Sequence, residues 1–166
     1  MKIAFFGLTE QAKIDHYRQS LATHDLNFFE NNLSEETLPE QKDFDIISIF
    51  TGSHITAKVI ENLQNLKLIT IRSTGFDNVD LESAKARNIV VSNVPDYGSH
   101  TVAEFTFGLI LSLSRKIPQA IERVKTDGEF NYSGLQGFDL FGKTLGVVGT
   151  GRIGQNVVQI AKGFGM

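Results

Sequence analysis

The sequence predicts an α/β protein with a doubly wound, mainly parallel sheet. Apolar runs of strand length recur over residues 2–93, and most are continuous rather than alternating. Continuous runs are typical of parallel strands that are buried on both faces. Segments with helical spacing separate several of these runs, and alternation of strands with helices is the order of a doubly wound sheet. A glycine-rich turn at 149–154 then indicates a second unit in the C-terminal part of the chain.

The strands of the first unit are predicted from five short apolar runs. Each is bounded by polar residues or by a turn-forming residue, and each is short enough for a strand. The five predicted strands are KIAFFG (2–7), LNFFE (26–30), DIISIF (45–50), LKLITIRS (66–73) and NIVVSN (88–93).

The helices of this unit are predicted from apolar residues that recur three to four positions apart. Asp80 is predicted to be the N-cap of a helix that begins LESAKAR, because its carboxylate can accept a bond from an amide of the first turn. The other two predicted helices present Ile14, Tyr17 and Leu21, and Ala57, Ile60 and Leu63.

The order of elements changes after the turn-like stretch NVPDYGSH. The segment 101–115 is apolar on nearly every side, so we expect a helix that is buried by more than one neighbour, between domains or subunits. An amphipathic helix is predicted over 116–130. A glycine-rich connector follows, and it leads into a predicted strand at 144–148. We therefore predict two domains, 1–98 and 99–166.

The composition excludes several classes of protein. The 166 residues are 41% hydrophobic and 21% charged, with a net charge of −3 and no cysteine. A basic stripe for nucleic acid is absent, no run reaches the ~18 apolar residues of a membrane span, and disulfides and thiolate chemistry are excluded. The N-terminal run breaks at Gly7 without a cleavage site, which predicts a strand rather than a signal peptide. A cytoplasmic protein without nucleic-acid or membrane partners is expected.

The glycine turn has the pattern and the setting of a dinucleotide-binding fingerprint. Gly149, Gly151 and Gly154 form G-x-G-x-x-G between a predicted strand and a predicted helix. The first glycine permits a tight turn, the second lets a pyrophosphate approach the backbone, and the third lets the helix pack on the strand. The amides of Arg152 and Ile153 would face the phosphates at the helix N-terminus. A structural turn without a ligand is the alternative.

A second candidate site follows the predicted strand 66–73. The strand ends in Ser73-Thr74-Gly75, where consecutive backbone amides can form a concavity for a carboxylate. Ligands of open α/β sheets bind at the carboxyl ends of the strands. A turn without a special role is equally compatible with these residues.

Three motifs, STGFDNVD, NVPDYGSHTVAE and GVVGTGRIGQ, resemble those of the D-isomer-specific 2-hydroxyacid dehydrogenases, especially the lactate-type members. The resemblance covers this whole chain but only about half of a typical member. It implies a flavodoxin-like substrate domain followed by the start of a Rossmann dinucleotide-binding domain. It also implies NAD as the cofactor and a homodimer formed through the cofactor domain, with the 101–115 helix near the interface. The residue that distinguishes NAD from NADP is expected ~20 residues beyond the turn, past position 166.

The resemblance also implies roles for particular residues. The amides of Thr74 and Gly75 would hold the substrate carboxylate. Phe50, which stands where a tyrosine is usual in the lactate enzymes, and Tyr97 would line the substrate side chain. Thr101 and Val102 would lie near the nicotinamide. Plain core packing is the alternative for Phe50, Tyr97 and Val102.

The family's acid/base machinery has no counterpart among these residues. An arginine, a glutamate and a histidine perform it, and all three are expected after Met166. The four histidines, His16, His24, His54 and His100, have no acidic partner at a suggestive spacing, and no metal site is predicted. We therefore expect no catalytic residue within 1–166 and no appreciable turnover by these residues alone.

The function implied by the resemblance is hydride transfer between NAD(H) and a small D-2-hydroxy acid or 2-keto acid of the D-lactate/pyruvate type. Two alternatives stay open. The chain is also compatible with a same-fold nucleotide-sensing binding protein, such as a corepressor. The second alternative is a related dehydrogenase of the same family that acts on glyoxylate, phosphoglycerate, formate or phosphite.

Overall fold

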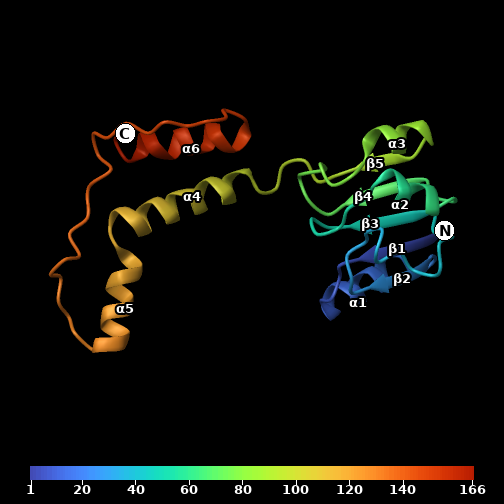
Figure 1. The fold of residues 1–166 in the computed structure, drawn as a ribbon, viewed down its shortest axis with the longest axis horizontal. Coiled ribbons are helices and arrows are strands. Elements are labelled where there is room, and N and C mark those ends of the chain that lie inside the picture. Colours follow the sequence, from blue (N-terminus) through green and yellow to red (C-terminus); the bar gives the residue numbers. More distant parts are fainter. The chain divides into compact units, whose positions relative to one another are not determined.

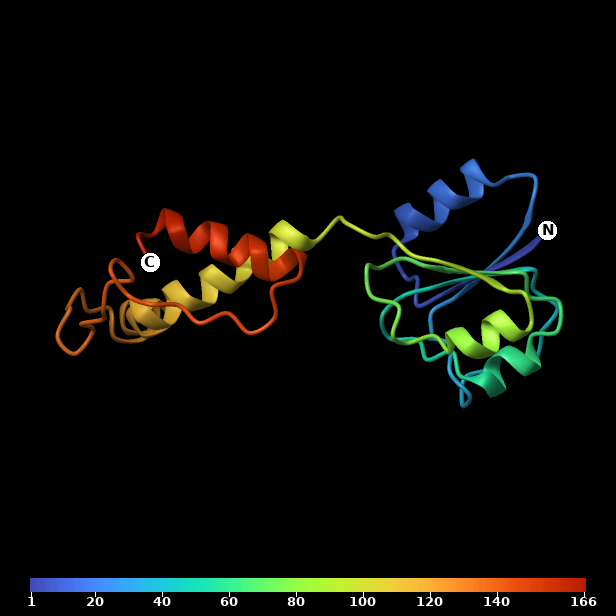
Figure 2. The ribbon, with the colours of Figure 1, turned by 90° about the horizontal axis from the view of Figure 1, so that it is seen from above.

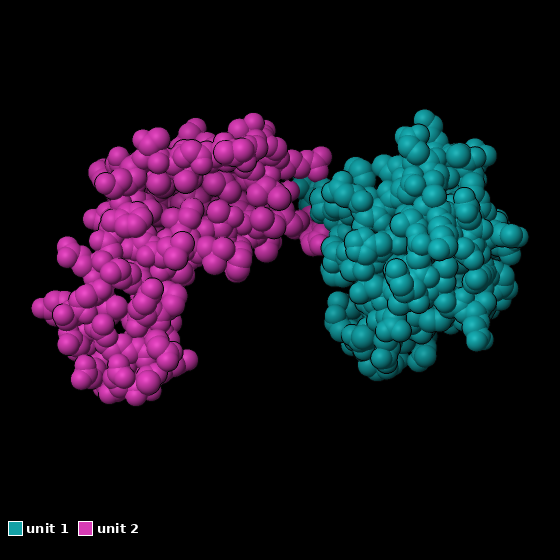
Figure 3. Space-filling view, in the orientation of Figure 1, with its two compact units in different colours: residues 1–96 teal, residues 97–166 magenta.

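The computed structural model describes residues 1–166, which form two compact units (Figure 3). Unit 1 comprises Met1–Asp96 and unit 2 comprises Tyr97–Met166. The division falls two residues before the domain boundary predicted at 98/99. Each unit is described by itself below.

Unit 1 contains one parallel sheet of five strands in the order β2-β1-β3-β4-β5 (Figure 1). This is the strand order of flavodoxin-like folds, and the α/β fold class predicted from the sequence is confirmed. The strands are β1 (Lys2–Phe6), β2 (Asp25–Phe29), β3 (Ile46–Ile49), β4 (Leu68–Ile71) and β5 (Val90–Ser92).

Helices cover both faces of this sheet. Helix α1 (Gln11–Ser20) lies on one face, and α2 (Ala57–Asn62) and α3 (Leu81–Ala86) lie on the other (Figure 2). Each face has its own apolar core, and the larger core is on the side of α2 and α3. The three helices begin within a few residues of the positions predicted from apolar spacing.

No helix connects β2 with β3. Residues 30–45 are irregular, and two side chains from this segment, Leu33 and Phe44, are completely buried in the larger core. The Phe44 ring packs edge-on against Phe6 and Phe29, at centroid distances of 6.4 and 6.0 Å. A loop anchored by these two side chains therefore covers the sheet where a doubly wound fold usually places a helix.

Helix α3 has a defined cap at each end. The Asp80 carboxylate accepts a bond from the Ser83 amide over 2.9 Å, which confirms the predicted N-cap. At the other end Asn88 has a left-handed backbone (φ 56°), and the amides of Asn88 and Ile89 donate to the carbonyls of Lys85 and Ala84. This is the pattern of a Schellman motif.

Unit 2 consists of three helices and a long connector. Helix α4 (Ser99–Ser114) packs against α6 (Arg152–Gly163), and α5 (Ile117–Asp127) follows α4 directly. The core between α4 and α6 includes Ala103, Phe107, Val157 and Ala161. The Phe107 ring also stacks on Phe164, at a centroid distance of 5.1 Å. No helix of the protein is long and apolar enough to cross a bilayer.

The strand predicted at 144–148 is not formed, and that prediction is wrong. The segment is extended but has no hydrogen-bonded strand beside it, because unit 2 contains no other strand. A parallel strand exists only where a neighbour supplies the other half of its hydrogen bonds. Leu145 and Val147 nevertheless lie against the α4–α6 core, whereas Val148 is fully exposed.

Helix α4, predicted to be buried by more than one neighbour between domains or subunits, packs against two helices of unit 2, and its burial by another domain or subunit stays a prediction. Ala103, Phe107 and Ser114 are its only buried residues. Within unit 2 it packs against α5 and α6, which cover one side and one end. Its opposite side exposes large apolar side chains, with exposed fractions of 46% at Val102, 68% at Phe105, 53% at Leu109 and 76% at Leu113.

Candidate functional site

The first candidate site lies at the carboxyl edge of the sheet in unit 1. Since all five strands are parallel, their carboxyl ends meet at one edge. Phe50 follows β3 and Thr74-Gly75 follows β4, and β3 and β4 are neighbours. The structure therefore brings together the loops that carry three of the four predicted substrate-binding residues.

The carbonyl groups of the Ser73–Gly75 turn are all bonded within the protein. The Asn93 side chain donates to the Thr74 carbonyl over 2.7 Å, and the Val94 amide donates to the Ser73 carbonyl over 3.0 Å. The buried Ser73 hydroxyl donates to the Gly75 carbonyl over 3.1 Å.

These bonds determine where the amides of Thr74 and Gly75 point. In a trans peptide the N–H lies opposite the C=O, so fixing the carbonyls of Ser73 and Thr74 fixes the next two amides. Both amides donate to no acceptor in the protein, and both residues are exposed. A Cβ at Gly75 would meet nothing within 4 Å. The turn thus presents two adjacent, oriented donors, which is the arrangement that binds a carboxylate.

The loop after β3 is fastened to the loop after β4 by Asn78. Its side-chain amide donates to the carbonyls of Phe50, over 3.3 Å, and Ser53, over 2.9 Å. The backbone carbonyl of Asn78 accepts a hydrogen bond of 2.8 Å from the Ile55 amide. The Phe50 side chain stays 41% exposed beside this junction, so it is available to contact a ligand as well as the protein.

Arg72 crosses the same edge of the sheet. It follows β4, and its guanidinium donates to the Phe6 carbonyl over 2.7 Å and to the Ser48 carbonyl over 2.9 Å. A further bond of 3.0 Å reaches the buried Ser48 hydroxyl. Burial lowers the pKa of the Arg72 guanidinium from its usual value, because it removes water from the charged group.

Sequence reasoning missed Arg72, Asn78 and Asn93. Arg72 is the charged residue near the end of the apolar run LKLITIRS, and Asn78 and Asn93 both lie within the quoted motifs. A charged or amide side chain at the end of a buried strand was the available signal. Their hydrogen-bond partners lie 19 to 66 positions away along the chain, so spacing alone does not reveal them.

The remaining predicted residues near the substrate and nicotinamide belong to unit 2. Tyr97 is 62% exposed and precedes α4. Thr101 and Val102 lie in the first turn of that helix, and both side chains are exposed. Their predicted contacts with substrate and cofactor remain predictions.

The second candidate site is the glycine turn at the start of α6. Gly149 has φ +91°, a backbone conformation that favours glycine. Gly154 is buried, and a Cβ there would overlap the carbonyl oxygen of Gly149. Gly151 is different, since its φ is −67° and a Cβ would meet nothing within 4 Å. Backbone conformation and packing within the protein therefore explain glycine at 149 and 154, but they do not explain glycine at 151.

This turn fits the pyrophosphate of a dinucleotide. Gly151 is the N-cap of α6 and no side chain caps that end, so the first amides of the helix are directed outward. The open space at Gly151 is where a phosphate would approach the backbone. Ile153 is 43% exposed, and so it lies beside this end rather than in the packed face formed by Val157 and Ala161.

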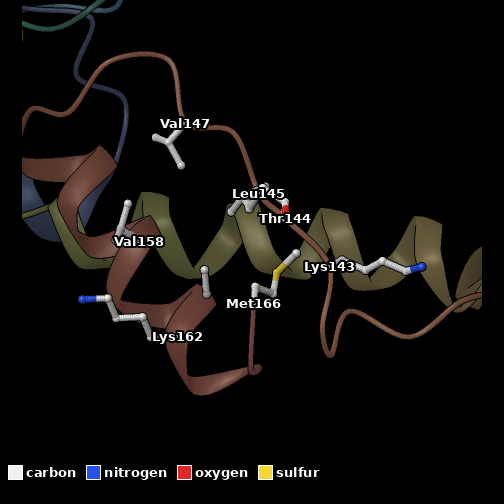
Figure 4. Close-up of a pocket in the computed structure, with 8 residues that line it drawn as sticks. Lys143, Thr144, Leu145, Val147, Val158, Lys162 and Met166 are labelled. Atoms are coloured by element: carbon white, nitrogen blue, oxygen red, sulfur yellow. The ribbon is translucent and has the colours of Figure 1, made fainter.

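An apolar groove of about 220 Å³ lies elsewhere in unit 2, between the 143–148 segment and α6 (Figure 4). Leu145, Val147 and Met166 form much of its wall, and the side chains of Lys143 and Lys162 extend in different directions at its ends. No carboxylate, histidine or hydroxyl nucleophile converges on it apart from the Thr144 side chain. The groove is exposed packing surface beside the unpaired extended segment rather than a site with chemistry. No cluster of potential metal ligands exists in the protein.

Comparison with known proteins identifies the class. The profile described as D-isomer specific 2-hydroxyacid dehydrogenase, catalytic domain, matches residues 3–162. The chain is 47% identical over 132 residues to a D-3-phosphoglycerate dehydrogenase of Methanocaldococcus jannaschii, covering 80% of this chain and 25% of that protein. It is 36% identical over 170 residues to a D-lactate dehydrogenase of Escherichia coli, covering 100% of this chain and 51% of that one.

A solved structure agrees with this result. The D-lactate dehydrogenase of Aquifex aeolicus, complexed with NAD and lactic acid, superimposes with a TM-score of 0.89 at 33% identity, covering 99% of this chain and 49% of that one. The chain belongs to the D-isomer-specific 2-hydroxyacid dehydrogenase family, as the three motifs predicted. It spans about half the length, or less, of these relatives.

Proposed function

We propose that the protein containing this chain is an NAD-dependent oxidoreductase that interconverts small 2-keto acids and D-2-hydroxy acids of the pyruvate/D-lactate type. The observation that carries the proposal is the pair of oriented, unbonded amides of Thr74 and Gly75 at the carboxyl edge of a flavodoxin-like sheet. Membership of a dehydrogenase family supports the same conclusion.

In this proposal unit 1 binds and orients the acid. The amides of Thr74 and Gly75 donate hydrogen bonds to the substrate carboxylate, and the exposed ring of Phe50 contacts the group attached to the keto carbon. Because the carboxylate is held at two points, the plane of the 2-keto acid is fixed, and only one of its faces is presented for reaction. Tyr97 is proposed to contact the substrate side chain on the strength of the family resemblance alone.

Unit 2 binds the cofactor in this proposal. Gly149, Gly151 and Gly154 form the cradle for the pyrophosphate, with Arg152 and Ile153 at the helix N-terminus. When bound, the nicotinamide supplies or accepts the hydride. Thr101 and Val102 limit the space around the nicotinamide ring. NAD is proposed because the Aquifex aeolicus relative is complexed with NAD.

The test is an NADH oxidation assay of the full-length protein with pyruvate, glyoxylate and larger 2-keto acids. We expect absorbance at 340 nm to fall with at least one of these acids and the product to be the D-isomer. A protein that binds NADH but turns over none of them would instead be a nucleotide-sensing binding protein, and the proposed activity would be wrong.

A phosphoglycerate-type substrate is the second candidate. The observation that favours it is the 47% identity to a D-3-phosphoglycerate dehydrogenase. Including 3-phosphoglycerate with NAD in the substrate panel distinguishes a phosphoglycerate-type enzyme from a lactate-type enzyme. A higher kcat/KM for 3-phosphoglycerate than for D-lactate would select this candidate.

We also propose that the protein is a homodimer. The support is the exposed apolar side of α4, which includes Phe105, Leu109 and Leu113. An apolar surface of this kind is typical of a contact between subunits. Light scattering should give twice the mass of one chain, and Leu113→Lys should lower that mass toward one chain.

A further inference from the structure

Arg72 is a half-buried cation that no acidic side chain neutralises. Its guanidinium bonds only to the carbonyls of Phe6, Gly7 and Ser48 and to the Ser48 hydroxyl. No carboxylate lies within the 4.0 Å of an ion pair, since the ion pairs of the protein all involve other cations. Moving a charge out of water without a counter-charge has an unfavourable free energy. A half-buried, unpaired arginine is therefore unusual unless its charge has a function.

The other basic residues at the edges of the sheet show the contrast. At the amino edge, Lys2 pairs with Asp43 and Lys67 pairs with Asp45, each over 2.6 Å. Those charges cancel locally. At the carboxyl edge the Arg72 charge is left uncancelled, and the Thr74-Gly75 amides begin two residues after it.

The Arg87 guanidinium also donates to backbone carbonyls and to no carboxylate, but a helix end accounts for its position. Its guanidinium donates to the carbonyls of Ile60, Leu63 and Gln64, at and beyond the end of α2. Carbonyls at a helix C-terminus carry partial negative charge and favour a cation. Arg72 has no helix end as its partner, because its acceptors lie at or just beyond the ends of the parallel strands β1 and β3.

We infer that Arg72 supplies the fixed positive charge that attracts the substrate carboxylate to the amides of Thr74 and Gly75. The inference rests on the proposed function. The strand-end carbonyls hold the guanidinium at the carboxyl edge without neutralising it, and partial burial reduces the solvent screening of its field. Arg72 is therefore a positioning residue that acts on the anion through space while the amides make the direct contact.

The experiment is a calorimetric titration of the full-length protein, saturated with NADH, with oxamate, an unreactive small carboxylate. Arg72→Gln should weaken oxamate binding about tenfold, which corresponds to ~1.4 kcal/mol. Arg72→Lys loses the forked hydrogen bonds but keeps the charge, so it should bind oxamate nearly as tightly as the natural protein. Arg87→Gln is the matched control. It removes an arginine that likewise donates to carbonyls and pairs with no carboxylate, and it should leave oxamate affinity unchanged.

Salt dependence provides a readout that a purely structural role does not affect. The oxamate affinity of the natural protein should fall as sodium chloride rises from 0.05 to about 0.5 M, because ions screen the attraction. The affinity of Arg72→Gln should fall less over the same range. If that variant does not fold, the comparison of Arg72→Lys with the natural protein, in oxamate affinity and in its salt dependence, still decides the matter.

Several results would overturn the inference. They are unchanged affinity in a folded Arg72→Gln, a folded Arg72→Lys as weak as Arg72→Gln, or no salt dependence in the natural protein. Absence of oxamate binding by the natural protein would overturn both the inference and the proposed function. Binding of oxamate with the expected dependence on Arg72, but no NADH oxidation with any 2-keto acid, would overturn the proposed activity alone.

Discussion

The Asn93 side chain, just after β5, donates a hydrogen bond of 2.7 Å to the carbonyl oxygen of Thr74, just after β4. The Thr74 carbonyl and the Gly75 amide belong to one rigid peptide plane. The bond therefore turns the Gly75 amide away from the Asn93 side chain. A residue that contacts no predicted ligand thus orients one of the two proposed carboxylate donors.

Replacing Asn93 by alanine should raise the KM for the 2-keto acid in the full-length protein. Loss of one hydrogen bond of ~1 kcal/mol that orients a donor corresponds to an increase of about fivefold. Steady-state kinetics measure this, with Asn65→Ala as the control, because Asn65 is an exposed asparagine in the turn before β4. Equal KM values for the Asn93 variant and the natural protein would show that the bond does not position the donor.

Gly151→Ala should weaken NADH binding at only a small cost in thermal stability, because alanine is a poorer N-cap residue than glycine. A Cβ at this position meets no protein atom, and its φ of −67° suits alanine, so only an approaching ligand would encounter the methyl group. Fluorescence titration with NADH measures the binding, and calorimetry gives Tm. Tight NADH binding by this variant would mean that the glycine turn is not a pyrophosphate site.

Gly154→Ala should have the opposite effect and lower Tm. The added Cβ would overlap the carbonyl oxygen of Gly149, so α6 must shift away from the turn. Overpacking of this kind costs ~1–3 kcal/mol. A variant with the Tm of the natural protein would show that the turn and the helix are less closely packed than the structure indicates.

Phe50→Ala should change the substrate preference. The ring is 41% exposed at the end of β3, so its loss enlarges the proposed pocket at a modest cost to the core. The kcat/KM for a larger apolar 2-keto acid, relative to pyruvate, should rise by about tenfold, the scale of a small change in an apolar pocket. Phe130→Ala, which removes a fully exposed ring in unit 2, is the control. If the ratio of the two kcat/KM values did not change, Phe50 would not line the substrate pocket.

Asp45→Asn should lower stability more at neutral pH than in acid. Hydrogen bonds from the Lys67 ammonium and the Lys2 backbone amide hold the pKa of the Asp45 carboxyl below its usual value. A carboxyl whose pKa is lowered by folding contributes stability above its unfolded pKa of about 3.9, and that contribution is lost as the pH falls through the folded pKa.

The check is a pair of urea denaturation curves, at pH 7 and near pH 3. The midpoint of Asp45→Asn should lie below that of the natural protein at pH 7, and the gap should narrow in acid. Asp77→Asn, which removes an exposed carboxylate without an ion pair, should show no gap at either pH. If the two urea midpoints differed equally at both pH values, the ionised form of Asp45 would not be what stabilises the fold.

The strands of unit 1 and the positions of its three helices were predictable from the amino-acid sequence. Continuous apolar runs such as DIISIF and the N-cap residue Asp80 act within a few neighbouring positions, so local pattern is enough to predict them. The three motifs were likewise sufficient for the family, which the comparisons confirmed. The predicted Thr74-Gly75 turn was recognised because it directly follows a buried strand.

Features that depend on residues distant in sequence became visible only in the folded chain. The extended segment 144–148 has the composition of a strand, yet it is not one, because a strand requires a hydrogen-bonded neighbour. Gly151 and Gly154 look alike in the motif, but only a Cβ at Gly154 would meet the backbone. The direction of the Thr74-Gly75 amides depends on Asn93 and Val94, and the uncancelled charge of Arg72 depends on carbonyls of β1 and β3. These relationships arise only when the parallel strands are brought side by side, so no local pattern encodes them.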